Sequence, residues 1–167
     1  MEDRRILGID PSLVRCGWGV VVSRGSRLSH VAHGVIKPYA KAELPHRLDD
    51  LHVALVAIIA EYAPTHVAVE DAFMKDNAQS ALKLGQARAA CLLAGTRAGL
   101  PVGEYAPRSV KQAVVGTGAA TKEQVAHMVC ALLPGVKLRA GDAADALAIA
   151  ICHSQRIGSR IAQLRRA

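Results

Sequence analysis

Two acids end predicted strands and two share one helical face, an arrangement in which four carboxylates could act together. Asp10 closes the strand RRILGID, and Glu70 closes the strand THVAVE. Asp142 and Asp145 lie three residues apart on the last predicted helix, so they project from the same face of it. Because functional groups gather at the carboxyl ends of neighbouring strands in open sheets, we expect the four side chains to meet there.

The chemistry that such a group of carboxylates favours is the binding of hard divalent cations. The seven histidines are scattered without ligand spacing, which favours Mg²⁺ over zinc, with Mn²⁺ as a substitute. A cation would also compensate acids that the small, apolar last helix turns toward the sheet, where an unpaired carboxylate is costly. Two such ions about 4 Å apart can activate a water and stabilise a leaving oxygen in phosphoryl displacement. The acids therefore predict metal-dependent hydrolysis of a phosphate ester.

Ordinary structural roles could also explain each acid taken singly. Asp142 and Asp145 would interact favourably with the dipole of a helix that begins beside them. Asp10 could be a turn acid, and Glu70 could be a solvated strand end. The occurrence of all four together favours the metal-binding interpretation.

The charge balance indicates a polyanionic partner. Lys and Arg total 21 and Asp and Glu total 14, a formal surplus of seven positive charges. Nucleic acid is the simplest partner for such a chain, and an anionic membrane surface is the competing one. With only five aromatic residues, an extended base-stacking platform is excluded. An acidic metal pocket within a basic chain is what a nuclease needs.

The elements that must position the acids follow from the hydrophobic pattern. Strands are expected over 4–10, 17–23 and 28–37 with short turns between them, which indicates an antiparallel meander. Two further strands are expected over 65–70 and 101–105. The helices between and after them are expected over 42–62, 78–98, 109–115, 121–133 and 140–155, and Thr121 with Gln124 forms a plausible capping box.

This element order is that of an α/β, ribonuclease H-like protein, with a five-stranded mixed sheet flanked by helices. We expect one nuclease domain over 1–155 and a loosely ordered basic C-terminal tail over 156–167. The arginines of the tail, Arg160, Arg165 and Arg166, could form a nucleic-acid arm or simply be solvated. The four cysteines lie far apart without a C-x-x-C pair, so we expect them to be reduced.

The expected cellular location rests on the apolar segments of the sequence. The first residues, MEDRR, have no apolar stretch of the kind a secretory signal needs. The longest apolar runs, over 53–60 and 143–152, are too short to cross a bilayer. We therefore expect a soluble, cytoplasmic protein without a membrane partner.

Five stretches resemble the RuvC family of bacterial Holliday-junction resolvases, over nearly the whole chain. They are LGIDP at 7–11, VAVEDAF at 67–73, NAQSALKLGQAR at 77–88, VKQAVVGTG at 110–118 and DAADALAI at 142–149. The resemblance implies that Asp10, Glu70, Asp142 and Asp145 bind two metal ions and catalyse hydrolysis. It implies an endonuclease that makes symmetric paired nicks in four-way DNA junctions during recombination and repair.

The same resemblance implies roles in DNA binding for three further residues. Phe73 would wedge against bases near the junction centre, although a lone Phe could also pack in the core. Lys111 and Lys122 would contact the scissile region, although both could lie on solvated helix faces. One departure is Ser12, which stands where the family usually has Gly and would strain a turn that needs a positive φ.

The resemblance also implies protein partners. Small and apolar residues of the long helix, Ala81, Gly85, Ala89 and Leu92, would build a two-fold homodimer that matches the two equivalent strands of a junction. A RuvA-type junction-binding protein and a RuvB-type branch-migration motor are the implied partners.

Two other functions remain open. A noncatalytic module for binding four-way junctions would keep the fold, although it should lack at least one of the four acids. A ribonuclease H-type nuclease would cut RNA–DNA hybrids, and a comparison of substrates would separate it. A phosphate loop over 116–122 is rejected because its spacing is wrong, and a sugar-kinase fold is rejected because the chain is too short.

Overall fold

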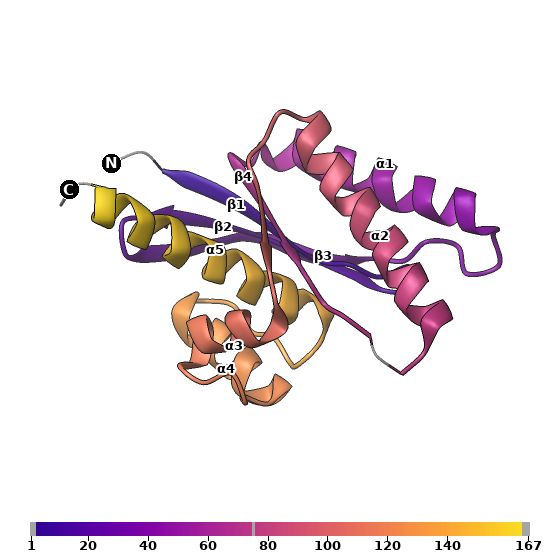
Figure 1. Ribbon diagram of the computed structural model, residues 1–167. Coiled ribbons are helices and arrows are strands. Elements are labelled where there is room, and N and C mark those ends of the chain that lie inside the picture. The colour runs from indigo at the N-terminus through magenta and orange to yellow at the C-terminus, as the bar shows by residue number, and fades with distance from the viewer. Residues whose placement is uncertain (1–2, 75, 165–167) are drawn as a thin grey trace.

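One five-stranded sheet organises the chain in the computed structural model, which describes residues 3–74 and 76–164, with side chains to residue 158 (Figure 1). Strands β1 (Arg4–Asp10), β2 (Cys16–Arg24) and β3 (Arg27–Ile36) form the antiparallel meander that the pattern predicts. Strands β4 (His66–Glu70) and β5 (Val102–Tyr105) continue the sheet in parallel beyond β1. The order is β3-β2-β1-β4-β5, which confirms the mixed sheet.

Helices cover both faces of this sheet (Figure 1). Helices α1 (Leu44–Tyr62) and α2 (Ala78–Arg97) pack on one face. Helix α5 (Asp142–Leu164) lies along the other face, joined there by α3 (Pro107–Val115) and α4 (Lys122–Leu132). No helix in the described part of the chain is both long and apolar enough to cross a membrane.

The side chains of strand β1 point alternately into the two hydrophobic cores, one on each face of the sheet. Ile6 belongs to the core beneath α5, whereas Leu7 and Ile9 belong to the core beneath α1 and α2. A Cβ at Gly8 would collide with the carbonyl of Ala146, so glycine at this position lets α5 lie directly on the strand. All four cysteines are free, as expected.

Local side-chain hydrogen bonds stabilise the start of α4 and the loop after β1. Thr121 caps α4 in a reciprocal capping box with Gln124, as predicted. Ser12 does not strain the first loop, because it lies outside the positive-φ region and its hydroxyl accepts hydrogen bonds from two backbone amides. The departure from glycine there is accommodated.

The predicted end of the last helix is wrong. Helix α5 continues to Leu164, beyond the expected end at residue 155, so the backbone of most of the expected loose tail is helical. The polar residues at 154–156 interrupt the apolar pattern without breaking the helix, and Ser154 among them is still buried. Arg165 and Arg166 lie outside the described residues, and so does the side chain of Arg160.

Candidate active site

The ends of β1 and β4 bring two of the predicted acids together. These strands pair in parallel, with Ile9 opposite Val69, so the next residues along each strand are Asp10 and Glu70. Both carboxylates therefore leave the sheet at the same edge, as the sequence predicted. Their positions depend on the register of buried strands and on no mobile loop.

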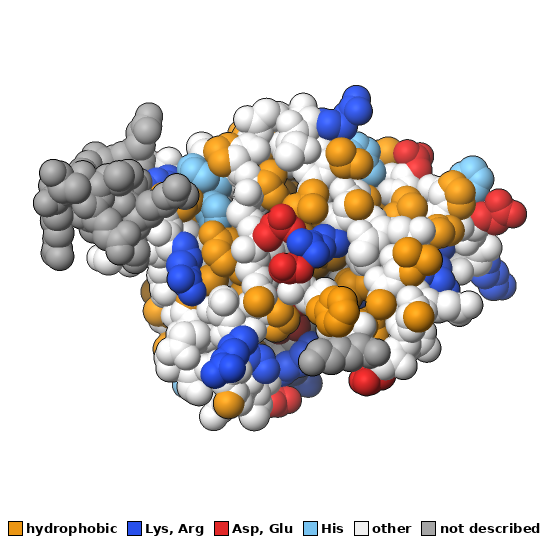
Figure 2. Space-filling model, in the orientation of Figure 1, with side chains coloured by type: hydrophobic (Ala, Val, Ile, Leu, Met, Phe, Trp, Pro, Cys, Tyr) orange, Lys and Arg blue, Asp and Glu red, His pale blue; other side chains and the backbone are white. Residues whose placement is uncertain are grey.

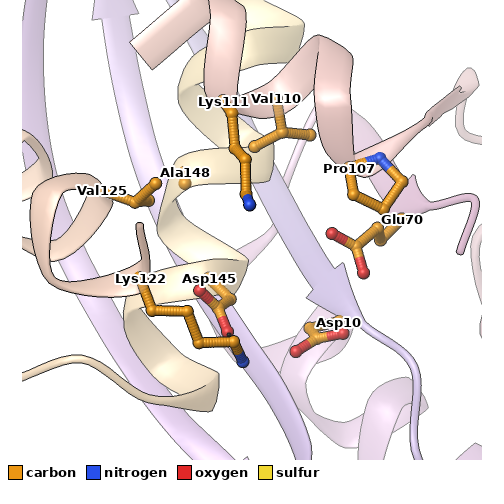
Figure 3. Close-up of a pocket in the computed structure, with 9 residues that line it drawn as sticks. All are labelled: Asp10, Glu70, Pro107, Val110, Lys111, Lys122, Val125, Asp145 and Ala148. Carbon is orange, nitrogen blue, oxygen red and sulfur yellow. Dashed lines mark hydrogen bonds and ion pairs between the residues drawn. The ribbon is translucent and has the colours of Figure 1, made fainter. Parts of the chain in front are cut away.

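Three of the acids and both predicted lysines line a single pocket of about 250 Å³ (Figure 3). Asp145 enters it from the first turn of α5. Lys111 reaches it from α3 and Lys122 from the start of α4, with their amino groups directed toward the acids. The rest of the wall is apolar and consists of Pro107, Val110, Val125 and Ala148. Residues from five different elements thus converge on one site.

Burial makes the two strand acids difficult to ionise. The pKa of Asp10 is raised from 3.8 to about 8, mainly by burial and then by the negative charges of Glu70 and Asp145. The pKa of Glu70 is raised from 4.5 to about 7, mainly by burial and then by Asp145. The positive charge of Lys122 opposes both shifts. Added positive charge in this pocket would therefore be strongly favourable at neutral pH.

The two helix acids are each engaged by a basic side chain. Lys122 Nζ lies 3.0 Å from Asp145 Oδ2, and this hydrogen bond is the main cause of the raised pKa of Lys122. Arg15 Nε lies 2.7 Å from Asp142 Oδ2. Asp142 is not among the residues that line the pocket, so the structure brings three of the four predicted acids into it and leaves the fourth outside its lining.

The donor set suits a hard cation, although the side chains do not yet enclose one. Oxygen is the only ligand atom that the lining acids offer, which is what Mg²⁺ and Mn²⁺ prefer. In the described part of the chain, no three His, Cys, Asp or Glu side chains are grouped closely enough to hold a metal. Asp142 and Asp145 are instead ion-paired with Arg15 and Lys122.

Phe73 lies outside the pocket, on the segment that follows β4. Its side chain is 81% exposed, so it does not pack in the core. Val14, which follows β1 in the sequence, and Met74, which follows β4, are also exposed. An exposed Phe beside an acidic pocket is free to contact a ligand that covers both.

One contact that sequence reasoning missed is that of Arg15 with Asp142. Arg15 lies in the irregular loop between β1 and β2, where no periodic pattern indicates the direction of a side chain. The basic residues are otherwise distributed widely, and Figure 2 shows Lys and Arg side chains spread over the visible face. Charge alone therefore did not distinguish Arg15 from the others.

Comparison with known proteins gives consistent matches along the chain. A family model described as crossover junction endodeoxyribonuclease RuvC matches residues 6–153. A protein of that name from Maricaulis maris is 61% identical over 150 residues, which cover 90% of each chain. Another, from Paramagnetospirillum magneticum, is 54% identical over 156 residues, which cover 93% of this chain and 94% of that protein.

Solved structures agree with these matches. The structure of T. thermophilus RuvC in complex with Holliday junction substrate has a TM-score of 0.87 and 36% identity, and covers 94% of this chain and 96% of that one. The yeast mitochondrial Holliday junction resolvase Ydc2 has a TM-score of 0.71 at 14% identity, which is a likeness of fold. The predicted ribonuclease H-like fold class is thus confirmed.

Proposed function

The chain belongs to the RuvC family of crossover junction endodeoxyribonucleases, and we propose that its acidic pocket cuts four-way DNA junctions by symmetric paired nicks. The observation that carries this proposal is the convergence of Asp10, Glu70 and Asp145 with Lys111 and Lys122 in one pocket. Carboxylates that bind cations and lysines that bind phosphate are the two parts that hydrolysis of a DNA strand requires.

We assign metal binding and catalysis to Asp10, Glu70, Asp142 and Asp145. The buried strand acids gain most from a cation, because burial and the negative charge of Asp145 oppose the ionisation of both. We expect two Mg²⁺ ions, with Mn²⁺ as a substitute. When bound, such ions lower the pKa of a coordinated water and stabilise the charge of a phosphoryl transition state.

The two lysines have a separate role toward the scissile strand. Lys111 and Lys122 direct positive charge into the pocket from one side, and Asp10 and Glu70 lie on the other (Figure 3). Asp145 lies on the side of the lysines, in contact with Lys122. Placed there, they can hold the oxygens of the scissile phosphate and neutralise the charge that develops on it. Lys122 must exchange its contact with Asp145 for one with the phosphate.

Phe73 would contact bases near the centre of the junction. Its exposure supports this role, because a large apolar side chain in water gains free energy when it packs against a base. The formal surplus of seven positive charges supports binding to the phosphate backbone around it.

A homodimer would place two such pockets on the two equivalent strands of a junction. Helix α2 supplies an exposed, partly apolar face for it. Gly85 and Ala89 of the predicted set are exposed, whereas Ala81 and Leu92 are partly buried within the protomer. The exposed Leu82 and Leu93 therefore replace those two in the proposed interface.

The remaining expectations rest on family membership. We propose that the protein acts on chromosomal DNA in the cytoplasm. We also propose that it works with a RuvA-type junction-binding protein and a RuvB-type branch-migration motor.

The test is cleavage of a synthetic four-way junction whose branch point migrates through many sequences, with Mg²⁺ or with EDTA. Symmetric Mg²⁺-dependent nicks in the junction, and none in linear duplex or RNA–DNA hybrid, are expected. Cleavage of the hybrid in preference to the junction would support a ribonuclease H-type activity. Junction binding without nicks would support a noncatalytic module.

A further inference from the structure

Asp142 is paired with Arg15 and is the one predicted acid that does not line the pocket. Its Oδ2 accepts a hydrogen bond from Arg15 Nε at 2.7 Å, in the same first turn of α5 from which Asp145 enters the pocket. Asp145 also has a basic partner, but Lys122 holds it within the pocket. Asp142 is thus the one predicted acid whose basic partner, like the acid itself, is not among the residues that line the pocket.

The loop that carries Arg15 is built to keep this geometry. Ser12 Oγ accepts hydrogen bonds from the backbone amides of Val14 at 3.0 Å and Arg15 at 3.1 Å, which fixes the turn after β1. Two residues beyond Arg15, a Cβ at Gly17 would collide with the carbonyl of Asp142. The start of β2 and the start of α5 are therefore in direct backbone contact, and Arg15 lies beside Asp142 as a consequence.

Arg15 is also placed to bind DNA. Its side chain is about half exposed, and it pairs with Asp142 through Nε. A half-exposed guanidinium can reach a phosphate, which it binds in a bidentate manner. Because Arg15 pairs with Asp142 in the turn of α5 that also carries Asp145, a DNA strand seated in the pocket can bring a phosphate within its reach.

Building on the proposed function, we propose that Arg15 is a positioning residue that couples DNA binding to completion of the metal site. In the DNA-free protein Arg15 holds Asp142 away from the metal-binding acids. A phosphate of the junction then takes the guanidinium, and Asp142 turns to join them. Because coupling between two ligands is reciprocal, bound metal strengthens junction binding by the same factor.

The first part of the test is titration of the DNA-free protein with Mn²⁺, followed by electron paramagnetic resonance. Arg15→Gln frees Asp142, so we expect Mn²⁺ to bind about 3- to 10-fold more tightly, as the loss of one competing ion pair allows. In an Asp142→Asn background the same substitution should give little gain. Arg15→Lys, which keeps the charge, should resemble the wild type more closely than Arg15→Gln does.

Arg24→Gln is the matched control, because Arg24 pairs with Asp3 on the surface beside the far end of β1. It should leave Mn²⁺ affinity unchanged. The proposal is overturned if Arg15→Gln has no effect, or if its gain persists undiminished in the Asp142→Asn background, which would indicate charge acting through space. If the wild type does not bind Mn²⁺, or if Asp10→Asn does not abolish that binding, the proposed metal site itself is wrong.

The second part is junction binding in EDTA as a function of salt concentration. Loss of one phosphate contact in Arg15→Gln should reduce the slope of log K against log salt by about 0.9. Arg24→Gln should leave the slope unchanged. An unchanged slope for Arg15→Gln would contradict transfer of the guanidinium to a phosphate.

Discussion

The two acids on the strands and the two acids on the last helix are positioned by different kinds of interaction. Asp10 and Glu70 are positioned by buried, parallel strands and have no basic partner at hydrogen-bond distance among the described residues. Asp142 and Asp145 lie in the first turn of α5, and each pairs with a basic side chain. The strands therefore supply a rigid, electrostatically strained pair, and the helix supplies two acids whose direction depends on what competes for their partners.

The largest expected difference is in cleavage. Asp10→Asn or Glu70→Gln should lower the rate of junction cleavage by about 10³-fold or more, because each removes a rigid metal ligand worth several kcal/mol. Junction binding in EDTA should be retained. Glu104→Gln, on the neighbouring strand and paired with Arg88, is the control and should cut almost normally. Normal cleavage by Glu70→Gln would show that the metal site is misassigned.

Lys122 tests the helix side of the comparison. Lys122→Gln should lower the cleavage rate by about 10- to 100-fold, because a charged hydrogen bond to the phosphate is worth about 1–3 kcal/mol. Single-turnover rates at saturating protein would measure this. Lys122→Arg keeps the charge and should recover part of the loss. Equal rates for Lys122→Gln and the wild type would mean that the lysine only neutralises Asp145.

Much of this arrangement could be predicted from the sequence because it depends on strand registration. Asp10 and Glu70 end β-branched runs, and parallel pairing of those runs leaves them no alternative position. The pairing of Asp142 with Arg15 could not be predicted, because Arg15 lies in a loop where no periodicity constrains its side chain. The continuation of α5 to Leu164 is not predicted, because the basic residues of 156–167 are interpreted as a solvated tail although Ile157, Ile161 and Leu164 keep a helical spacing.

Phe73 lies three residues beyond Glu70 and outside the pocket, so its substitution tests DNA binding separately from the metal site. Phe73→Ala should weaken junction binding by about 10-fold, because stacking on one base is worth about 1–3 kcal/mol. The melting temperature should not change, since the side chain is 81% exposed. Tyr39→Ala, which removes another exposed aromatic side chain, is the matched control. A fall in Tm for Phe73→Ala would point to core packing instead.

The smallest expected effect is on stability in the absence of metal. The pKa of Asp10 is about 8 in the folded protein and near 3.8 when unfolded, so the folded state keeps a proton that the unfolded chain releases. Its contribution to stability is therefore lost as pH rises from about 4 to 8. In EDTA, Asp10→Asn should raise Tm at pH 8 by about 2–4 °C for each kcal/mol relieved. It should have little effect at pH 4.

The Tm of Asp10→Asn must be compared with that of the wild type at each pH, because the titration of other groups changes stability in the opposite direction. Burial lowers the pKa of His153 to about 4, so its contribution to stability is present above pH 6.5 and is lost as pH falls toward 4. A Tm difference that does not depend on pH would contradict burial of an ionisable Asp10.

The most direct test of the contrast between the two pairs of acids is Mn²⁺ affinity of the DNA-free protein in two matched substitutions. Asp10→Asn removes a strand acid that the pocket already presents, and Asp142→Asn removes a helix acid that Arg15 holds aside. We expect Asp10→Asn to abolish Mn²⁺ binding and Asp142→Asn to leave it nearly unchanged. Equal losses in the two variants would contradict the account, because both acids would then already belong to one assembled site.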